Sequence, residues 1–247
     1  MVIFHHRQRN ISNFKLNLRI NDTSTEQVSE FNFLGIMLDE CMTWKSHIQK
    51  ISGKISVVNG VLSRLKKYIP SDILKIIYSA LIQPHLNYGV LLWGKNTKRI
   101  QKLQKWAIRS VTCSKYNAHT DPLFIELKLL KIQDIYKLNI LKFFFKYHND
   151  KLPNYFNGMF DTIYISHNYF TRQGGQPVVA RGRTIAANHS IRYTLPEEIK
   201  NTHACIIEKL ATHSLNGFSN YAKQYYISRY NPICNIENCY ICNRESP

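Results

Sequence analysis

Acidic residues are scarce in this sequence. The 247 residues include 16 aspartates and glutamates against 33 lysines and arginines, which gives a formal net charge of +17. Such a balance argues for polyanionic partners, nucleic acid first and an anionic membrane surface second. Glycine is also sparse, and 44% of the residues are hydrophobic, so the composition is that of a globular protein that can bury a core.

Several motifs that carry catalysis are missing. No two aspartates are adjacent, and Gly174-Gly175 is not followed by the Lys-Ser/Thr pair of a phosphate-binding loop. No glycine-rich nucleophile turn accompanies the cysteines and histidines, which disfavours a hydrolase. His119-Thr120-Asp121 matches half of an iron-binding triad, but the position of Asp121 before Pro122 is better explained as a helix start.

A long apolar run is missing as well. Residues 76–94 contain no Asp, Glu, Lys or Arg, yet Gln83, Pro84, His85 and Asn87 stand at their centre, where a bilayer leaves polar groups unpaired. We therefore expect a buried helix, a turn and a second apolar segment, and no membrane partner. Because the first residues lack the pattern of a secretory signal, we expect an intracellular protein of the cytoplasm or nucleus with reduced thiols.

The hydrophobic period changes near Trp44. Before it, alternation over residues 14–20 and an apolar run over residues 28–38 predict short strands. After it, apolar residues recur three and four apart from Ile48 to Leu65, which predicts a helix with one buried stripe. The lysines that lie off this stripe include Lys45, Lys50 and Lys54.

Further helices are expected on the same grounds. They are predicted from residue 71 to about Pro84 and over residues 97–113, 132–148 and 214–230, with short strands and loops over residues 161–195. The expected fold class is therefore mainly α with a small N-terminal antiparallel β piece (α+β), followed by a smaller mixed C-terminal region.

The helix over residues 97–113 carries a row of cations. Lys98, Lys102, Lys105 and Arg109 fall within roughly 60° of one another at 100° per residue, opposite the apolar positions. No acid lies among them, and unpaired like charges destabilise a helix. We predict that this row, together with Lys45, Lys50 and Lys54, contacts a phosphate backbone, although a merely solvated face is the alternative.

The C-terminal tail contains three closely spaced cysteines, Cys234, Cys239 and Cys242. Thiolates at this spacing suit Zn²⁺, which takes four ligands in a structural site. The fourth ligand would be Cys205, His203 or His213, brought close by folding. The alternative is a reduced, unstructured tail.

The order of several motifs resembles the reverse transcriptases of non-LTR retrotransposons, and more narrowly the region after the polymerase palm in the jockey and related clades. The resemblance is specific only when the matches are taken together over most of the chain. The matching positions are Phe33-Leu34-Gly35, Asp39, Trp44, His47-Ile48, Tyr78, Leu81-Ile82, Pro84, Tyr88-Gly89 and Trp93-Gly94, followed by segments at 103–112, 119–124, 171–173 and 191–196.

This resemblance implies a division of the chain. Residues 1–43 would be the last strands of the palm and residues 44–155 a helical thumb-like domain that grips a template–primer duplex. Independently of the resemblance, the glycines, prolines and polar residues of 161–195 set off a mixed C-terminal region over residues 156–230, and residues 231–247 form a cysteine-containing tail. The family's polymerases hold Mg²⁺ with an Asp-Asp pair and a third Asp, whereas the aspartates of this chain are scattered singly.

Three functional hypotheses follow. The first is a non-catalytic fragment of a retrotransposon RNA-directed DNA polymerase, starting at an internal methionine, that binds RNA or an RNA–DNA hybrid independently of sequence. The second is the C-terminal piece of an active reverse transcriptase whose catalytic palm lies upstream of a mispredicted start. The third is an expressed fragment with no stable fold, because the strands at its start have lost their partners. A weaker alternative follows from the likeness to a segment found in AlkB-like proteins fused to tRNA methyltransferases.

Overall fold

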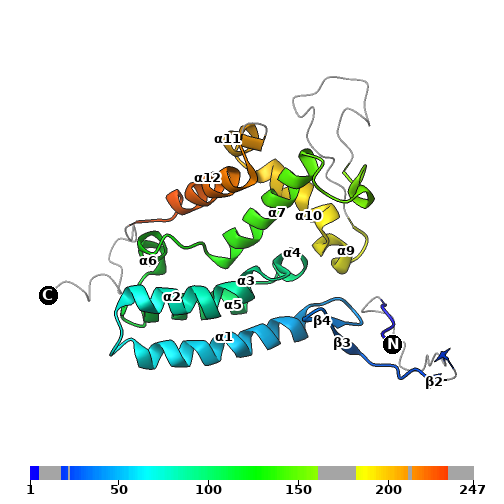
Figure 1. Cartoon of the computed structure of the whole chain (residues 1–247), viewed down its shortest axis with the longest axis horizontal. Helices are drawn as coiled ribbons and strands as arrows, with labels where there is room; N and C mark the ends of the chain where they lie inside the picture. The colour runs from blue at the N-terminus through cyan, green and yellow to red at the C-terminus, as the bar shows by residue number, and fades with distance from the viewer. Residues whose placement is uncertain (6–17, 22, 161–181, 211–212, 233–247) are drawn as a thin grey trace.

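The computed structural model describes residues 1–5, 18–21, 23–160, 182–210 and 213–232. Over these residues the chain is mainly helical and begins with small antiparallel strands, so the predicted fold class is confirmed. Figure 1 shows a β-hairpin at one end of the longest helix and the later helices stacked above it.

The strands form two separate two-stranded ladders. β1 (Arg19–Ile20) pairs with β2 (Thr23–Ser24), and β3 (Glu30–Phe33) pairs with β4 (Ile36–Asp39). A single strand over residues 28–38 was the prediction, and it is wrong. Leu34 and Gly35 have φ values of +47° and +82°, and two successive positive φ angles reverse the chain into a tight hairpin.

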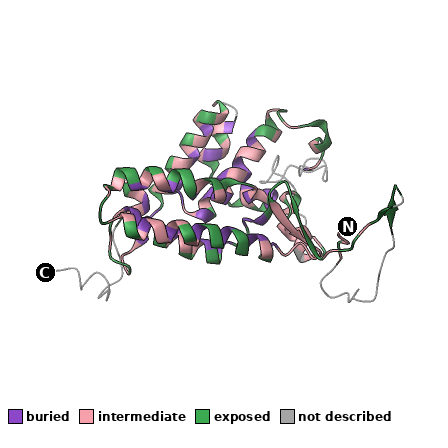
Figure 2. Ribbon diagram, turned by 60° about the horizontal axis from the view of Figure 1, so that its bottom comes forward, coloured by how far each residue is buried: buried purple, intermediate pink, exposed green. Residues whose placement is uncertain are grey.

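Three helices form the lower part of the molecule in Figure 1: α1 (Lys45–Leu65), α2 (Ser71–Leu81) and α5 (Lys98–Val111). The predicted stripe of α1 points into the core, and Ile55 and Leu62 are fully buried. Figure 2 shows the two faces of these helices, one buried and one exposed. The α1–α5 contact is fixed by a hydrogen bond of 2.9 Å from Asn59 Nδ2 to the Leu103 carbonyl oxygen.

The uncharged segment over residues 76–94 folds as short, broken helices. After α2 the chain forms α3 (Gln83–Asn87) and α4 (Val90–Trp93). Pro84 was expected to end a helix, but it lies in the first turn of α3, where its missing N–H costs nothing. Among the described residues, no helix is both long and apolar enough to cross a membrane.

The next two helices are α6 (Thr120–Glu126) and α7 (Ile132–His148). Asp121 was expected to cap α6, yet the cap position is His119 and its side chain makes no capping bond. The Asp121 carboxylate instead accepts a 2.7 Å hydrogen bond from Lys131 Nζ. It therefore links the start of α6 to the start of α7.

The C-terminal region is also helical where it is described. It contains a 3₁₀ turn at Asn154–Phe156, α9 (Ile185–His189), α10 (Ile191–Asn201), α11 (Ala204–Ile207), a 3₁₀ turn at Glu208–Leu210 and α12 (Leu215–Ser228). Short strands and loops were expected over residues 161–195. Residues 161–181 lie outside the described residues, and over residues 185–195 the expectation of strands is wrong. The Thr184 hydroxyl accepts a hydrogen bond from the Ala187 N–H and so starts α9 as an N-cap.

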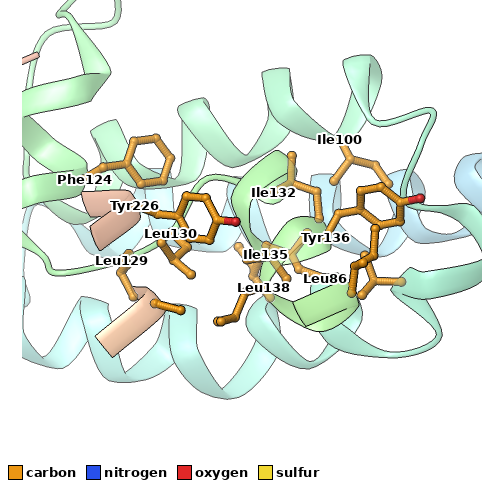
Figure 3. Close-up of a cluster of buried hydrophobic side chains, with 14 of the residues drawn as sticks. Leu86, Ile100, Phe124, Leu129, Leu130, Ile132, Ile135, Tyr136, Leu138 and Tyr226 are labelled. Carbon is orange, nitrogen blue, oxygen red and sulfur yellow. The ribbon is translucent and has the colours of Figure 1, made fainter. Parts of the chain in front are cut away.

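One hydrophobic core joins α1 to α7 with α10, α11 and α12. Buried side chains run without a break from Trp44 in the junction before α1 to Tyr230 after α12. Figure 3 shows the centre of this core, where Leu86, Ile100, Ile132 and Tyr136 from three different helices point toward one another. Helices α10 and α12 both pack on α7, so the later helices rest on the earlier ones.

Candidate nucleic-acid interface

The predicted row of cations lies on the outer face of α5. Ile100, Ala107 and Val111 are fully buried on the inner face of this helix. Lys98 and Lys102 are exposed, while Lys105 and Arg109 are partly buried. The four side chains are spaced by about 4.5–6 Å along the helix axis, which is similar to the separation of neighbouring phosphates along a nucleic-acid strand.

Acidic side chains do not neutralise this row in the described part of the chain. The ion pairs found there join Lys95 to Glu197 and Lys131 to Asp121, and His5 lies 3.7 Å from the carboxylate of Glu40. The surface of α5 therefore keeps the uncompensated positive charge that the sequence indicated.

Arg109 differs from the three lysines because it has a structural contact. Its Nε donates a 2.8 Å hydrogen bond to the carbonyl oxygen of Ala118, in the segment between α5 and α6. Burial lowers the pKa of its guanidinium from the usual value, but an arginine remains charged at neutral pH. Arg109 thus holds the loop after α5 and contributes charge from a less accessible position.

Trp106 is a candidate that sequence reasoning missed. It follows Lys102 by four residues, so Lys98, Lys102 and Trp106 form one row along the helix surface. Its side chain is 44% exposed, although tryptophan is usually buried. An exposed indole beside lysines suits contact with a sugar or an unpaired base. The signal in the sequence was its position four residues after Lys102, which places Trp106 on the same helix face as the lysines.

The basic surface continues past the end of α5. Cys113 Sγ lies 3.5 Å from the carbonyl oxygen of Lys66, the residue that follows α1. This contact brings the pair Lys66-Lys67 next to the C-terminal end of α5, and Lys67 is exposed.

The lysines of α1 do not form one surface with this row. Lys50 and Lys54 lie roughly 140–180° around α1 from Asn59, which contacts α5. Both lie close enough to His47 to lower the pKa of that histidine, and Lys54 has the same effect on His85. Lys45 is exposed at the start of α1. The predicted cations therefore lie on two separate surfaces, one on α5 and one on the side of α1 that faces away from α5.

The motif residues near the hairpin have structural roles. The Asp39 carboxylate accepts hydrogen bonds from the backbone N–H groups of Cys41, Thr43 and Trp44, with its shortest contacts at 2.9 Å. These bonds hold the turn in which Trp44 takes a left-handed conformation with φ +64°. Asp39 therefore orients α1 relative to β4.

Aromatic motif residues complete the same junction. The Tyr88 hydroxyl donates to the carbonyl oxygen of Leu34, and Trp93 Nε1 donates to the carbonyl oxygen of Tyr88 at 3.0 Å. His47 packs edge-on against Trp93 at a centroid distance of 5.9 Å. We call Leu34, Asp39, Trp44, His47, Tyr88 and Trp93 the hairpin–helix junction.

A largely apolar hollow lies beside this junction. It measures about 430 Å³ and lies between the hairpin and α9. Its lining is apolar apart from the tyrosine hydroxyl of Tyr88 and the side chains of His189 and Ser190. Paired carboxylates that could hold Mg²⁺ are not among its lining residues.

The predicted zinc ligands are only partly described. Cys234, Cys239 and Cys242 lie outside the described residues. Of the suggested fourth ligands, His203 uses Nδ1 to accept a bond from the Cys205 N–H at the start of α11. The zinc site of the tail stays a prediction.

The known proteins that this chain resembles are all of one kind. Over 146 residues the chain is 27% identical to a probable RNA-directed DNA polymerase from transposon X-element of Drosophila melanogaster. Over 145 residues it is 26% identical to the RNA-directed DNA polymerase from mobile element jockey of Drosophila funebris. Over 117 residues it is 26% identical to a probable RNA-directed DNA polymerase from transposon BS of Drosophila melanogaster. The resemblance inferred from the motifs is thus confirmed.

These matches cover a limited part of the relatives. The alignments include 56%, 55% and 44% of this chain, but only 15%, 15% and 13% of the respective relatives. No protein-family model matches the chain. No solved structure matches it either.

Proposed function

We propose that this chain is a non-catalytic, polymerase-derived module that binds RNA or an RNA–DNA hybrid through the phosphate backbone. The row of cations on α5 carries the proposal, because its lysines stand on the outer face of one helix without acidic partners in the described structure. The similarity to RNA-directed DNA polymerases of mobile elements supports nucleic acid as the ligand class.

The test compares binding across a salt series. A triple variant, Lys98→Gln, Lys102→Gln and Lys105→Gln, keeps Arg109 because that side chain holds the loop before α6. Fluorescence anisotropy is measured with an RNA–DNA hybrid and with single-stranded RNA. We expect the variant to bind both nucleic acids at least about tenfold more weakly. The slope of log affinity against log salt concentration should decrease in magnitude by about 2 to 3, because binding then releases fewer counterions from the phosphates.

A charge-matched control separates a local site from diffuse attraction. Lys128, Lys146 and Lys200 are exposed lysines on other parts of the surface, and changing all three to Gln removes the same net charge. If this control loses as much affinity as the α5 variant, the interface proposed on α5 is wrong. A double variant, Lys50→Gln and Lys54→Gln, then tests separately whether the side of α1 that faces away from α5 binds nucleic acid.

A second candidate function is that the chain works as the C-terminal piece of an active reverse transcriptase. The observation that favours it is coverage, since the alignments span no more than 15% of each relative. A primer-extension assay with the purified chain and Mg²⁺ tests the non-catalytic proposal, for which we expect no incorporation. An in-frame Tyr-x-Asp-Asp sequence in the genomic DNA upstream of Met1 would favour the second candidate.

A further inference from the structure

Three metal-binding side chains converge where the N-terminal segment meets the turn after β4. His5 Nε2 lies 3.7 Å from Glu40 Oε1 and 4.0 Å from Cys41 Sγ. All three donor atoms lie within 4.8 Å of one another, and each residue is partly buried. We propose that His5, Glu40 and Cys41 form a Zn²⁺ site that is distinct from the cysteines of the tail.

The distances suit a tetrahedral ion. Bonds of about 2.0–2.3 Å from zinc to nitrogen, oxygen and sulfur place neighbouring ligand atoms about 3.3–3.6 Å apart. The two separations from His5 Nε2, 3.7 and 4.0 Å, therefore need to shrink by roughly 0.3–0.5 Å. The Glu40–Cys41 separation, which is within 4.8 Å, has to shorten as well. A thiolate and a carboxylate together balance the two charges of the ion, and a neutral imidazole completes the protein ligand set.

The backbone around these residues is already held in place. The His5 N–H donates to the Glu40 carbonyl oxygen at 3.0 Å, and the Glu40 N–H donates to the Ser29 carbonyl oxygen at 3.0 Å. The Cys41 N–H donates to the Asp39 carboxylate at 3.2 Å. Each ligand thus projects from a fixed backbone, which reduces the entropy lost when the ion binds.

Such an ion would have a clear structural effect. His5 belongs to the first residues of the chain, whereas Glu40 and Cys41 immediately precede the hairpin–helix junction. Zinc would therefore fasten the N-terminal segment to the turn from which α1 starts. The three residues leave a fourth coordination position for water or another donor.

The experiment uses the full chain with Cys234→Ser, Cys239→Ser and Cys242→Ser as background, so that the tail cannot supply ligands. Zn²⁺ affinity is measured by competition with a chromophoric chelator, and Co²⁺ is added as a spectroscopic probe. We expect one bound ion per chain, tetrahedral cobalt bands in the visible range and a thiolate-to-cobalt charge-transfer band. Zn²⁺ should also raise the thermal midpoint of this background.

Single variants assign the ligands. His5→Ala and Cys41→Ser should each weaken Zn²⁺ binding at least about tenfold, and Cys41→Ser should also abolish the charge-transfer band and the thermal shift. Cys113→Ser is the matched control, because Cys113 is an exposed thiol just after the C-terminal end of α5, beside Lys66 at the opposite end of α1 from the proposed site, and its loss should change nothing. Binding that is as tight in Cys41→Ser as in the background, or the absence of a charge-transfer band, would overturn the site.

Discussion

Gln104 shows how much one buried polar side chain can hold together. It is fully buried on the inner face of α5. Its Nε2 donates to the Tyr78 hydroxyl at 3.0 Å and to the Leu130 carbonyl oxygen at 2.9 Å, while its Oε1 accepts from the Ile132 N–H at 2.8 Å. This one amide therefore joins α5 to α2 and to the start of α7.

Replacing Gln104 with leucine should reduce the free energy of unfolding by about 3 kcal/mol, because the Leu130 carbonyl and the Ile132 N–H would be left buried without their partner. Urea unfolding followed by circular dichroism measures the change. Gln101→Leu on the same helix is the control, since Gln101 is only partly buried, and it should change stability by less than about 0.5 kcal/mol. Equal effects of the two variants would contradict the assigned role.

His47 predicts a dependence of stability on pH. It is 2% exposed, and its Nδ1 accepts a bond from the Met37 N–H at 3.3 Å. Burial, followed by the charges of Lys50 and Lys54, lowers its pKa below the usual 6.5. The folded state thus binds this proton less tightly than the unfolded state. Its stabilising contribution is present above pH 6.5 and is lost as the pH falls through the folded pKa.

We expect the unfolding free energy of the wild type to fall more steeply between pH 7 and pH 5 than that of His47→Gln, which cannot take up this proton. Chemical denaturation at several pH values gives both curves. His148→Gln is a suitable comparison because His148 is exposed near the end of α7, and it should follow the wild type. Parallel curves for His47→Gln and the wild type would rule out this source of acid sensitivity.

At the scale of an element, two glycines differ in the space around them. A Cβ on Gly94, after α4, would lie 2.3 Å from Tyr136 Cδ2 and 2.4 Å from the Val90 carbonyl oxygen. A Cβ on Gly53, within α1, would meet nothing within 4 Å. The first glycine permits α4 to approach α7, whereas the second only lowers the helix propensity of α1.

The two Gly→Ala substitutions should therefore change stability in opposite directions. Gly94→Ala should destabilise by about 1–3 kcal/mol because Tyr136 must move, and Gly53→Ala should stabilise by about 1 kcal/mol. Thermal unfolding of both variants beside the wild type measures the two signs. Stabilisation by Gly94→Ala would show that the packing of α4 on α7 is not tight at this point.

These elements also show what could be predicted from the sequence. The helix period predicted α1, α5, α7 and α12 because long amphipathic patterns depend on local spacing alone. The hairpin was missed because Leu34 carries no turn signal, although it takes a positive φ. The sequence also did not show that Lys50 and Lys54 face away from α5, since their direction depends on which side of α1 packs against α5.

At the scale of the whole molecule, the continuous core bears on how the chain unfolds. The change of sequence character over residues 161–195 predicted a boundary near residue 155, and that division stays a prediction. The buried side chains on both sides of it pack in one cluster. Tyr230, which follows α12, donates a 2.6 Å hydrogen bond to Asp134 Oδ2 of α7 and accepts another of 3.0 Å from the Lys131 N–H.

Tyr230→Phe should therefore destabilise the whole molecule and not its C-terminal part alone. We expect a loss of about 2 kcal/mol, because the partly buried Lys131 N–H and Asp134 carboxylate lose their partner. In calorimetry this loss should lower the midpoint of one cooperative transition by about 4–8 °C. Tyr155→Phe is the control, because Tyr155 is 84% exposed. Two transitions, of which Tyr230→Phe moves only one, would show that the later helices unfold independently and would support the boundary near residue 155.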